Sequence, residues 1–228
     1  MNKQKGIAIS LVMIQAVASL SLLFWLLPRP AAVHAESWTV NTFTDEADGS
    51  CDDATCSLRD AVALSAPFDT ILLPAGSYTL SAGLGQINVA KTITLTGQGA
   101  LASDTIIDGD GAMRLFNVSS GTTTLSNLTL QNGQPASGNG GGILTSGAGS
   151  LTLDNAIVQE NVSPGHGGGI YLAGGSLNIL NGSQVLSNTA VASGSGTGGG
   201  FYVQQGTANL TNSTIAQNSA QFGGGIGL

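Results

Sequence analysis

A glycine triplet followed by an apolar residue occurs four times in this chain, at residues 140–143, 167–170, 198–201 and 223–226. The first glycines of successive triplets lie 27, 31 and 25 residues apart, counted from Gly140. A period of roughly 20 to 50 residues indicates a repeat architecture, in which copies of one unit stack on one another. The triplets therefore restrict the second half of the chain to a stacked array.

A second fixed point in each unit is a β-branched residue three positions before an asparagine. The pairs are Val158 with Asn161, Val185 with Asn188, and Ile215 with Asn218. Each asparagine follows the first glycine of its triplet by 21, 21 and 20 residues, whereas the next triplet follows after 6, 10 and 5 residues. Because the length varies in one connection, we expect loops to project from one edge of the stack.

Each unit contains three short apolar runs. In the second unit these are Ile170/Leu172, Leu177/Ile179 and Val185. Short runs rich in Thr and β-branched residues, with glycine at the breaks, predict an all-β fold. Three strands per unit favour a single-stranded parallel β-helix over residues 67–228, with about 25–31 residues per coil. The final residues, 223–228, start a further unit, so we expect the coils to continue beyond this sequence.

Stacked coils would bring equivalent asparagines about 4.8 Å apart, where their amides can bond to one another. We expect one ladder at Asn161, Asn188 and Asn218, and a second at Asn155, Asn181 and Asn212. The alternative for each asparagine is a turn residue that tolerates left-handed backbone. The glycine triplets are expected at corners that need positive φ or no Cβ.

The first 35 residues have the features of a secretory signal peptide. Lys3 and Lys5 precede an apolar stretch over 6–27, and Val33-His34-Ala35 is a small-x-small cleavage motif. We expect cleavage after Ala35. The alternative is an uncleaved membrane anchor, since about 20 apolar residues can span a bilayer.

Residues 36–66 contain both cysteines, Cys51 and Cys56. In an exported protein such a close pair predicts a disulfide loop. The alternative is a pair of metal-ligating thiols, although two cysteines supply too few ligands for structural zinc.

A short helix is expected directly after Cys56, with Ser57 as its N-cap and Asp60 three residues later. Leu58 and Val62 share one face of this helix, so it can cover the open end of the first coil.

Charge restricts the partners of the chain. After removal of residues 1–35, three basic residues remain against 13 acidic ones, a net charge of −10. This balance disfavours nucleic acid as a partner, because nucleic-acid binding needs clustered Lys and Arg.

Two segments resemble known families. Residues 56–61, Cys-Ser-Leu-Arg-Asp-Ala, resemble the CSLREA domain of exported bacterial proteins, with Asp60 in place of the family's usual Glu. The glycine triplets and Val/Ile-x-x-Asn motifs resemble the polymorphic outer membrane protein repeat, usually Gly-Gly-Ala-Ile with Phe-x-x-Asn. These resemblances imply a right-handed parallel β-helix of the pectin-lyase-like kind on an exported or cell-surface protein. Some members of the family are adhesin-like.

We expect an exported, non-enzymatic scaffold, secreted or on the cell envelope, that presents loops for adhesion. Its expected partners are host or envelope surfaces or extracellular polysaccharide, with membrane contact only through an uncleaved signal segment. The alternative is a polysaccharide-binding or polysaccharide-degrading protein, a lyase or hydrolase with its site in the first coils. The residues available there are Asp104, Asp108, Asp110 and Arg114.

No cofactor is expected apart from calcium, for which there are two candidate groups. Asp108 and Asp110 form one, and Asp45 and Asp48 belong to an acidic loop that forms the other. Calcium takes several carboxylate and carbonyl oxygens, which both segments could supply. The alternative at Asp108-Gly109-Asp110-Gly111 is a tight turn, which Asp-Gly pairs favour without a metal.

Overall fold

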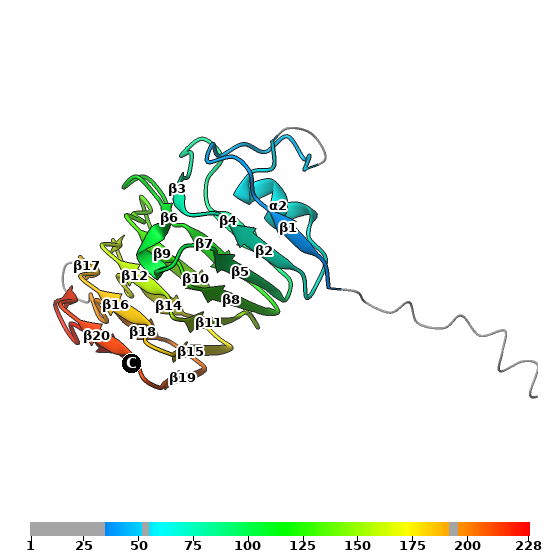
Figure 1. Ribbon diagram of the computed structural model, residues 1–228. Helices are drawn as coiled ribbons and strands as arrows, with labels where there is room; N and C mark the ends of the chain where they lie inside the picture. The colour runs from blue at the N-terminus through cyan, green and yellow to red at the C-terminus, as the bar shows by residue number, and fades with distance from the viewer. Residues whose placement is uncertain (1–34, 52–54, 192–195) are drawn as a thin grey trace, which may run out of the picture. The chain divides into compact units, whose positions relative to one another are not determined.

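The computed structural model describes residues 35–51, 55–191 and 196–228. The chain divides into two units at residue 35, and the second unit, residues 35–228, is described here. The predicted signal peptide, except Ala35, lies outside the described residues. The second unit is a right-handed parallel β-helix of about 6 turns, which confirms the predicted all-β solenoid (Figure 1).

Three parallel sheets, here called A, B and C, run along the solenoid. Sheet A contains β1 (Ser37–Thr39), β2 (Thr70–Leu73), β5 (Ile93–Gly97), β8 (Thr122–Ser126), β11 (Ser150–Asp154), β15 (Ser176–Leu180) and β19 (Thr207–Leu210). Sheet B contains β3 (Gly76–Thr79), β6 (Thr105–Asp108), β9 (Thr129–Gln131), β12 (Ile157–Gln159), β16 (Gln184–Leu186) and β20 (Thr214–Ala216). Sheet C contains β4 (Ile87–Val89), β7 (Phe116–Val118), β10 (Ile143–Thr145), β14 (Ile170–Leu172), β18 (Phe201–Val203) and β22 (Ile226–Gly227).

A fourth sheet, D, was not predicted. It contains β13 (Val162–Ser163), β17 (Thr189–Ala190) and β21 (Ser219–Ala220), each placed directly after a ladder asparagine. Strands of two residues are too short to produce a visible alternation of apolar and polar residues. The pairing of each coil with the next orders these residues nonetheless, through bonds such as Val191 N to Ser163 O at 2.9 Å.

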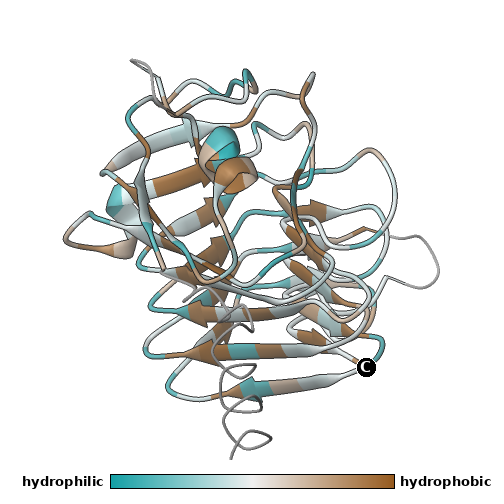
Figure 2. Cartoon of the chain, turned by 90° about the vertical axis from the view of Figure 1, so that its right-hand side faces the viewer, coloured by the Kyte–Doolittle hydropathy of each residue, from teal (hydrophilic) through white to brown (hydrophobic). Residues whose placement is uncertain are grey.

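The core is built from ladders of like residues. In-register pairing stacks Tyr78, Ile107, Leu130, Val158, Val185 and Ile215 along sheet B. Sheet C stacks Ile87, Phe116, Ile143, Ile170, Phe201 and Ile226. Buried and more exposed residues alternate along the strands, and Figure 2 shows the hydrophobic residues interspersed with polar ones. A slip of one residue would turn a whole ladder outward, so burial fixes the register.

The first asparagine set forms a buried ladder. The Asn161 Nδ2 donates to Asn188 Oδ1 at 2.9 Å, and Asn188 Nδ2 donates to Asn218 Oδ1 at 3.0 Å. Each of these oxygens also accepts the backbone N–H of the preceding asparagine, at 3.0 and 2.9 Å. The ladder begins at Gly133, whose N–H donates to Asn161 Oδ1 at 2.7 Å. Side-chain amides thus satisfy the buried backbone at this corner.

The second asparagine set lies at an exposed corner. Asn155, Asn181 and Asn212 have φ values of 49°, 51° and 50°. Asn155 Nδ2 donates to Asn127 Oδ1 at 3.0 Å, but Asn181 Nδ2 donates to Asp154 Oδ1 instead of to the neighbouring asparagine. The alternative role, a turn residue that tolerates left-handed backbone, therefore describes this set better than a continuous ladder.

Each glycine of a triplet is required for a different reason. The first glycines are left-handed, with φ of 71°, 64°, 64° and 57° at Gly140, Gly167, Gly198 and Gly223. A Cβ at the second position would meet backbone of the next coil, since at Gly168 it would lie 2.2 Å from Gly199 O. A Cβ at the third position would press on the ladder, as at Gly169, where Asn188 Cγ would be 3.0 Å away.

The predicted helix is present as α2 (Leu58–Leu64) and covers the first coil. Ser57 is its N-cap, with Oγ accepting the N–H of Asp60 at 3.0 Å. The Asp60 carboxylate does not complete a capping box to the N-cap backbone but accepts the N–H of Gly49 at 3.0 Å. Leu58 and Val62 are buried, which confirms the expected apolar face.

The strand β1 was not predicted and forms the first member of sheet A. It pairs with β2, and Thr70 N donates to Glu36 O at 2.9 Å. The carboxylate of Asp69, 1% exposed, accepts from Glu36 N at 2.8 Å and from Trp38 Nε1 at 2.9 Å. Burial raises the pKa of Asp69, but these bonds, one from Ala66 N and the charge of Lys91 outweigh it and lower the pKa.

The ladder predicts a large cost for Asn188→Ala. This change leaves buried donors and acceptors of two adjacent coils without partners, so unfolding free energy should fall by about 2–4 kcal/mol. The matched change Asn181→Gly, at an exposed left-handed position, should alter it by less than about 0.5 kcal/mol. Urea denaturation followed by circular dichroism measures both; equal losses in the two variants would contradict the ladder.

The third glycine position allows a comparison between equivalent residues. In Gly169→Ala the new Cβ would lie 2.7 Å from Gly200 O, and the backbone must shift, costing about 2–3 kcal/mol. In Gly225→Ala the nearest atom is Ile215 Cγ2 at 3.4 Å, so we expect less than about 1 kcal/mol. Thermal unfolding of both variants would refute this explanation if Gly225→Ala were the more damaging change.

Candidate functional site

The connections that vary in length lie together at one edge of the solenoid, beside sheet D. We call residues 134–139, 164–166, 191, 196–197 and 221–222 the loop edge; part of it lies near the β17 label in Figure 1. Two backbone bonds between coils hold its base: Gly140 N to His166 O at 2.9 Å and Gly167 N to Thr197 O at 3.0 Å. The loop edge is thus held by hydrogen bonds to the first glycines of the triplets, at the corner of the coil that we call the triplet corner.

A groove of about 290 Å³ opens at the loop edge. It is lined by Gly111, Ala112, Gln134, Pro135, Ala136, Val162, Pro164 and Val191. These residues come from four connections far apart in the sequence. They share small or apolar side chains, and Gln134 adds a side-chain amide. Concave, mainly apolar surfaces with a few polar groups are typical of ligand sites.

The loop edge carries neither Asp, Glu, Lys nor Arg among its described residues. Two large apolar side chains are exposed there, Val191 and Phe222, each 56% accessible. The groove therefore presents apolar surface and amide groups, and an ionic ligand would find no countercharge on these loops.

His166 of the loop edge forms a stack with two tyrosines of sheet C. The His166 and Tyr202 rings lie 4.9 Å apart between centroids, and Tyr202 and Tyr171 lie 5.4 Å apart. His166 Nδ1 is 2.7 Å from Thr197 Oγ1. Burial, and then the neighbouring Tyr202, raise the pKa of Tyr171 against the opposing effect of a hydrogen bond with Asn139. The stack connects two neighbouring coils next to the loops.

Arg114 was a candidate for the alternative enzymatic function, and the structure places it under the first loop of the edge. Its Nε donates to Gly140 O at 2.9 Å, and Nη2 donates to Asn139 O at 2.7 Å. Nη1 donates to Gln86 Oε1 at 2.6 Å. Burial lowers the pKa of this guanidinium. These contacts make Arg114 a support for the loop 134–139.

Asp108 is the last residue of β6, and Asp110 lies in the turn that follows. The Asp108 carboxylate accepts from Gln131 Nε2 at 2.7 Å, from Asn132 Nδ2 at 2.9 Å and from Asp110 N at 2.8 Å. Asp110 has a φ of 51°, which fits the turn considered as the alternative to calcium. Asp104, the remaining candidate, accepts the N–H of Leu101 at 2.9 Å within a separate turn.

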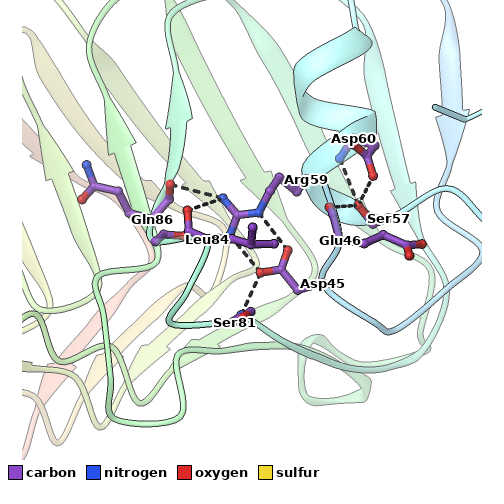
Figure 3. A network of polar contacts seen from close by, with 9 residues as sticks. Asp45, Glu46, Ser57, Arg59, Asp60, Ser81, Leu84 and Gln86 are labelled. Carbon is purple, nitrogen blue, oxygen red and sulfur yellow. Dashed lines mark hydrogen bonds and ion pairs between the residues drawn. The ribbon is translucent and has the colours of Figure 1, made fainter. Parts of the chain in front are cut away.

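The two carboxylates of the second calcium candidate, Asp45 and Asp48, form separate structural contacts, and Figure 3 shows those of Asp45. Asp45 forms a two-bond ion pair with Arg59, at 2.9 Å for each bond, and accepts the N–H of Ser81 at 2.7 Å. Asp48 accepts the N–H of Ser50 at 2.9 Å, within its own turn. Among described residues no cluster of three His, Cys, Asp or Glu could hold a metal; Asp52 and Asp53 lie outside that part.

The Cys51–Cys56 disulfide is formed as predicted, with the two Cα atoms 4.3 Å apart. It closes the loop that leads into α2. The bond is consistent with an oxidising compartment, where such disulfides persist.

The groove residues Pro135, Ala136 and Pro164 could not be singled out from the sequence. The sequence located the connection of uneven length, and so the edge of the solenoid, but it did not identify the side chains that meet there. Their meeting depends on the path of each loop, and Ser/Pro/Gly-rich loops carry no periodic signal.

Comparison with protein-family models, with curated proteins and with solved structures produced no match. The resemblances to the CSLREA domain and to the polymorphic outer membrane protein repeat therefore stay predictions. Among the described residues, no helix has the length and apolar character needed to cross a membrane.

The contacts of Arg114 predict a structural role that can be measured. Arg114→Ala would remove three donors from buried or half-buried acceptors and should lower the unfolding free energy by about 2–3 kcal/mol. Gln134→Ala, on the exposed part of the same loop, should change it by less than about 0.5 kcal/mol. Chemical denaturation tests both, and an Arg114→Ala protein as stable as the parent would count against this role.

Proposed function

We propose that the protein is an exported, non-enzymatic β-helix scaffold whose loop edge adheres to uncharged polysaccharide of a cell envelope or extracellular matrix. The observation that carries the proposal is the groove at the loop edge, where Pro135, Pro164 and Val191 lie beside polar groups in a surface of mixed polar and apolar character. The rest of the described unit is a regular stack, whereas this edge has loops of different lengths. Binding residues are commonly found on loops held by a rigid scaffold.

The chemistry of the edge fits an uncharged sugar polymer. Sugar rings offer apolar faces and many hydroxyl groups, so they suit apolar surfaces with nearby amide and hydroxyl groups. The groove combines prolines and Val191 with the amide of Gln134, and Thr197 and His166 belong to the same loop edge. A nucleic acid partner is disfavoured by the net charge of −10 expected after signal removal.

Export is supported by the disulfide and by the predicted signal peptide. The residues considered for polysaccharide cleavage have structural contacts instead. Arg114 supports loop 134–139, and Asp108 accepts hydrogen bonds from Gln131 and Asn132 of the next coil and from Asp110 in its own turn. We therefore propose adhesion and not cleavage as the role of this chain.

Retention on insoluble polysaccharides tests the proposal. The full chain, produced in an exporting bacterial host, is mixed with cellulose, chitin and bacterial envelope fractions, and the bound fraction is quantified. We expect retention of the parent protein and a roughly tenfold weaker affinity in Val191→Asp, because a charge in the apolar groove must be desolvated.

Leu101→Asp provides the matched control. Leu101 is 64% exposed and lies before η1 (Ala102–Asp104), between sheets A and B and away from the loop edge. This variant should bind like the parent. Absence of retention on every polymer, or equal weakening by both substitutions, would refute adhesion through the loop edge. Release of new reducing or unsaturated sugar ends would instead support the enzymatic alternative.

A further inference from the structure

A buried carboxylate that forms no salt bridge within the described residues lies at the start of sheet A. In the described part of the chain, the one salt bridge joins Arg59 to Asp45. Asp69 is only 1% exposed and accepts three N–H groups, two of them on Oδ2 from Trp38 and Ala66. Buried carboxylates are usually paired with a positive charge, whereas Asp69 is held by N–H groups and feels Lys91 only through its charge.

The third N–H comes from the residue that follows the predicted cleavage site. Glu36 N donates to Asp69 Oδ1 at 2.8 Å, and Glu36 O accepts from Thr70 N at 2.9 Å. The backbone of Glu36 is thus held on both sides of its Cα. Ala35 is exposed, and the compact unit begins at this residue, so the Ala35–Glu36 peptide bond lies at the border of the fold.

We propose that hydrolysis of the Ala35–Glu36 bond creates an α-ammonium group at Glu36 that forms an ion pair with the Asp69 carboxylate, so that processing stabilises the mature β-helix. The C–N bond breaks, the oxygen of water joins the Ala35 carbonyl carbon to give a carboxylate, and both protons of the water go to the released nitrogen, which becomes –NH₃⁺. The N–H already in contact with Asp69 Oδ1 becomes part of an –NH₃⁺ group at the same place. Charge-assisted bonds of this kind are about twice as strong as neutral ones.

The inference rests on the export that the proposed function includes, but it concerns a different end of the molecule. Its consequence is local: β1 and the loop 66–69 should be held more firmly after cleavage than before. Because β1 is the outermost strand of sheet A, its attachment protects an otherwise open sheet edge.

The pH dependence of the ion pair has a definite sign. The charged and titratable groups beside the new amine are Asp69, Lys91, which acts on Asp69, and the side chain of Glu36 itself. An α-amino group has an ordinary pKa of about 7.7–8.0, and pairing with Asp69 raises it. The added stability is therefore complete below that ordinary value and is lost as the pH rises through the raised one.

The test uses the protein that an exporting host makes from the full chain. N-terminal sequencing of the purified product should give Glu36. The mature chain contains one lysine, Lys91, so mild acetylation at about pH 6.5, below the ordinary pKa of the α-amine, can be directed to that amine and checked by peptide mass. Acetylation keeps the donor N–H but removes the charge.

We expect the free-amine form to melt about 3–6 °C above the acetylated form at about pH 6, and this difference to disappear above about pH 10. The difference should also disappear in the Asp69→Asn variant. If that substitution prevents folding, the acetylation comparison on the parent protein still decides the matter. Equal melting temperatures of the two forms in mild acid, or an N-terminus other than Glu36, would overturn the inference. Polysaccharide retention can succeed or fail independently, so the two proposals are separable.

Discussion

The structure depends on the in-register stacking of each coil on the next. Each strand pairs with the equivalent strand of the neighbouring coil, so equivalent residues of successive coils stack directly on one another. At most corners this stacking could leave buried backbone groups without partners. At the triplet corner, Asn161 and Asn188 provide them from their side chains, and the glycines make room for the adjacent coil. The register of the strands, the conformation of the glycine corner and the packing of the core therefore all depend on the stacking of the coils.

The repeats allowed much of the fold to be predicted from the sequence. The three strands of each repeat and the helix after Cys56 were expected from local patterns, because alternation and capping are encoded within a few residues. The strand β1 was missed, since Ser37–Thr39 is too short for a pattern and is ordered by its partner β2. Sheet D was missed for the same reason. Both asparagine sets were expected to form ladders, with a turn role as the alternative. Asn181 bonds to Asp154 instead of to the next asparagine, and this choice of partner depends on the geometry of the turn.

The candidate site was less accessible to sequence reasoning than the fold. Asp45 was predicted as a calcium candidate and Arg114 as a candidate for the enzymatic alternative because of their charge, but each holds a loop in place. The groove is made instead from Pro135, Pro164 and Val191, which have no distinctive chemistry until four connections meet. A regular scaffold with an irregular, uncharged edge is the physical basis for proposing adhesion. Near the N-terminal end of the described chain, the buried Asp69 is the basis for the separate proposal that processing stabilises the fold.

Residue-resolved native-state hydrogen exchange tests the central claim most directly, because it compares the rigid corner with the edge mounted on it. The backbone N–H groups of Asn161 and Asn188, which donate to ladder oxygens, should be among the slowest to exchange. The N–H groups of Ala136 and Ser137, in an exposed loop, should exchange orders of magnitude faster. Equal protection at the two places, or rapid exchange at Asn161 and Asn188, would contradict an account in which a buried amide ladder holds an accessible loop edge.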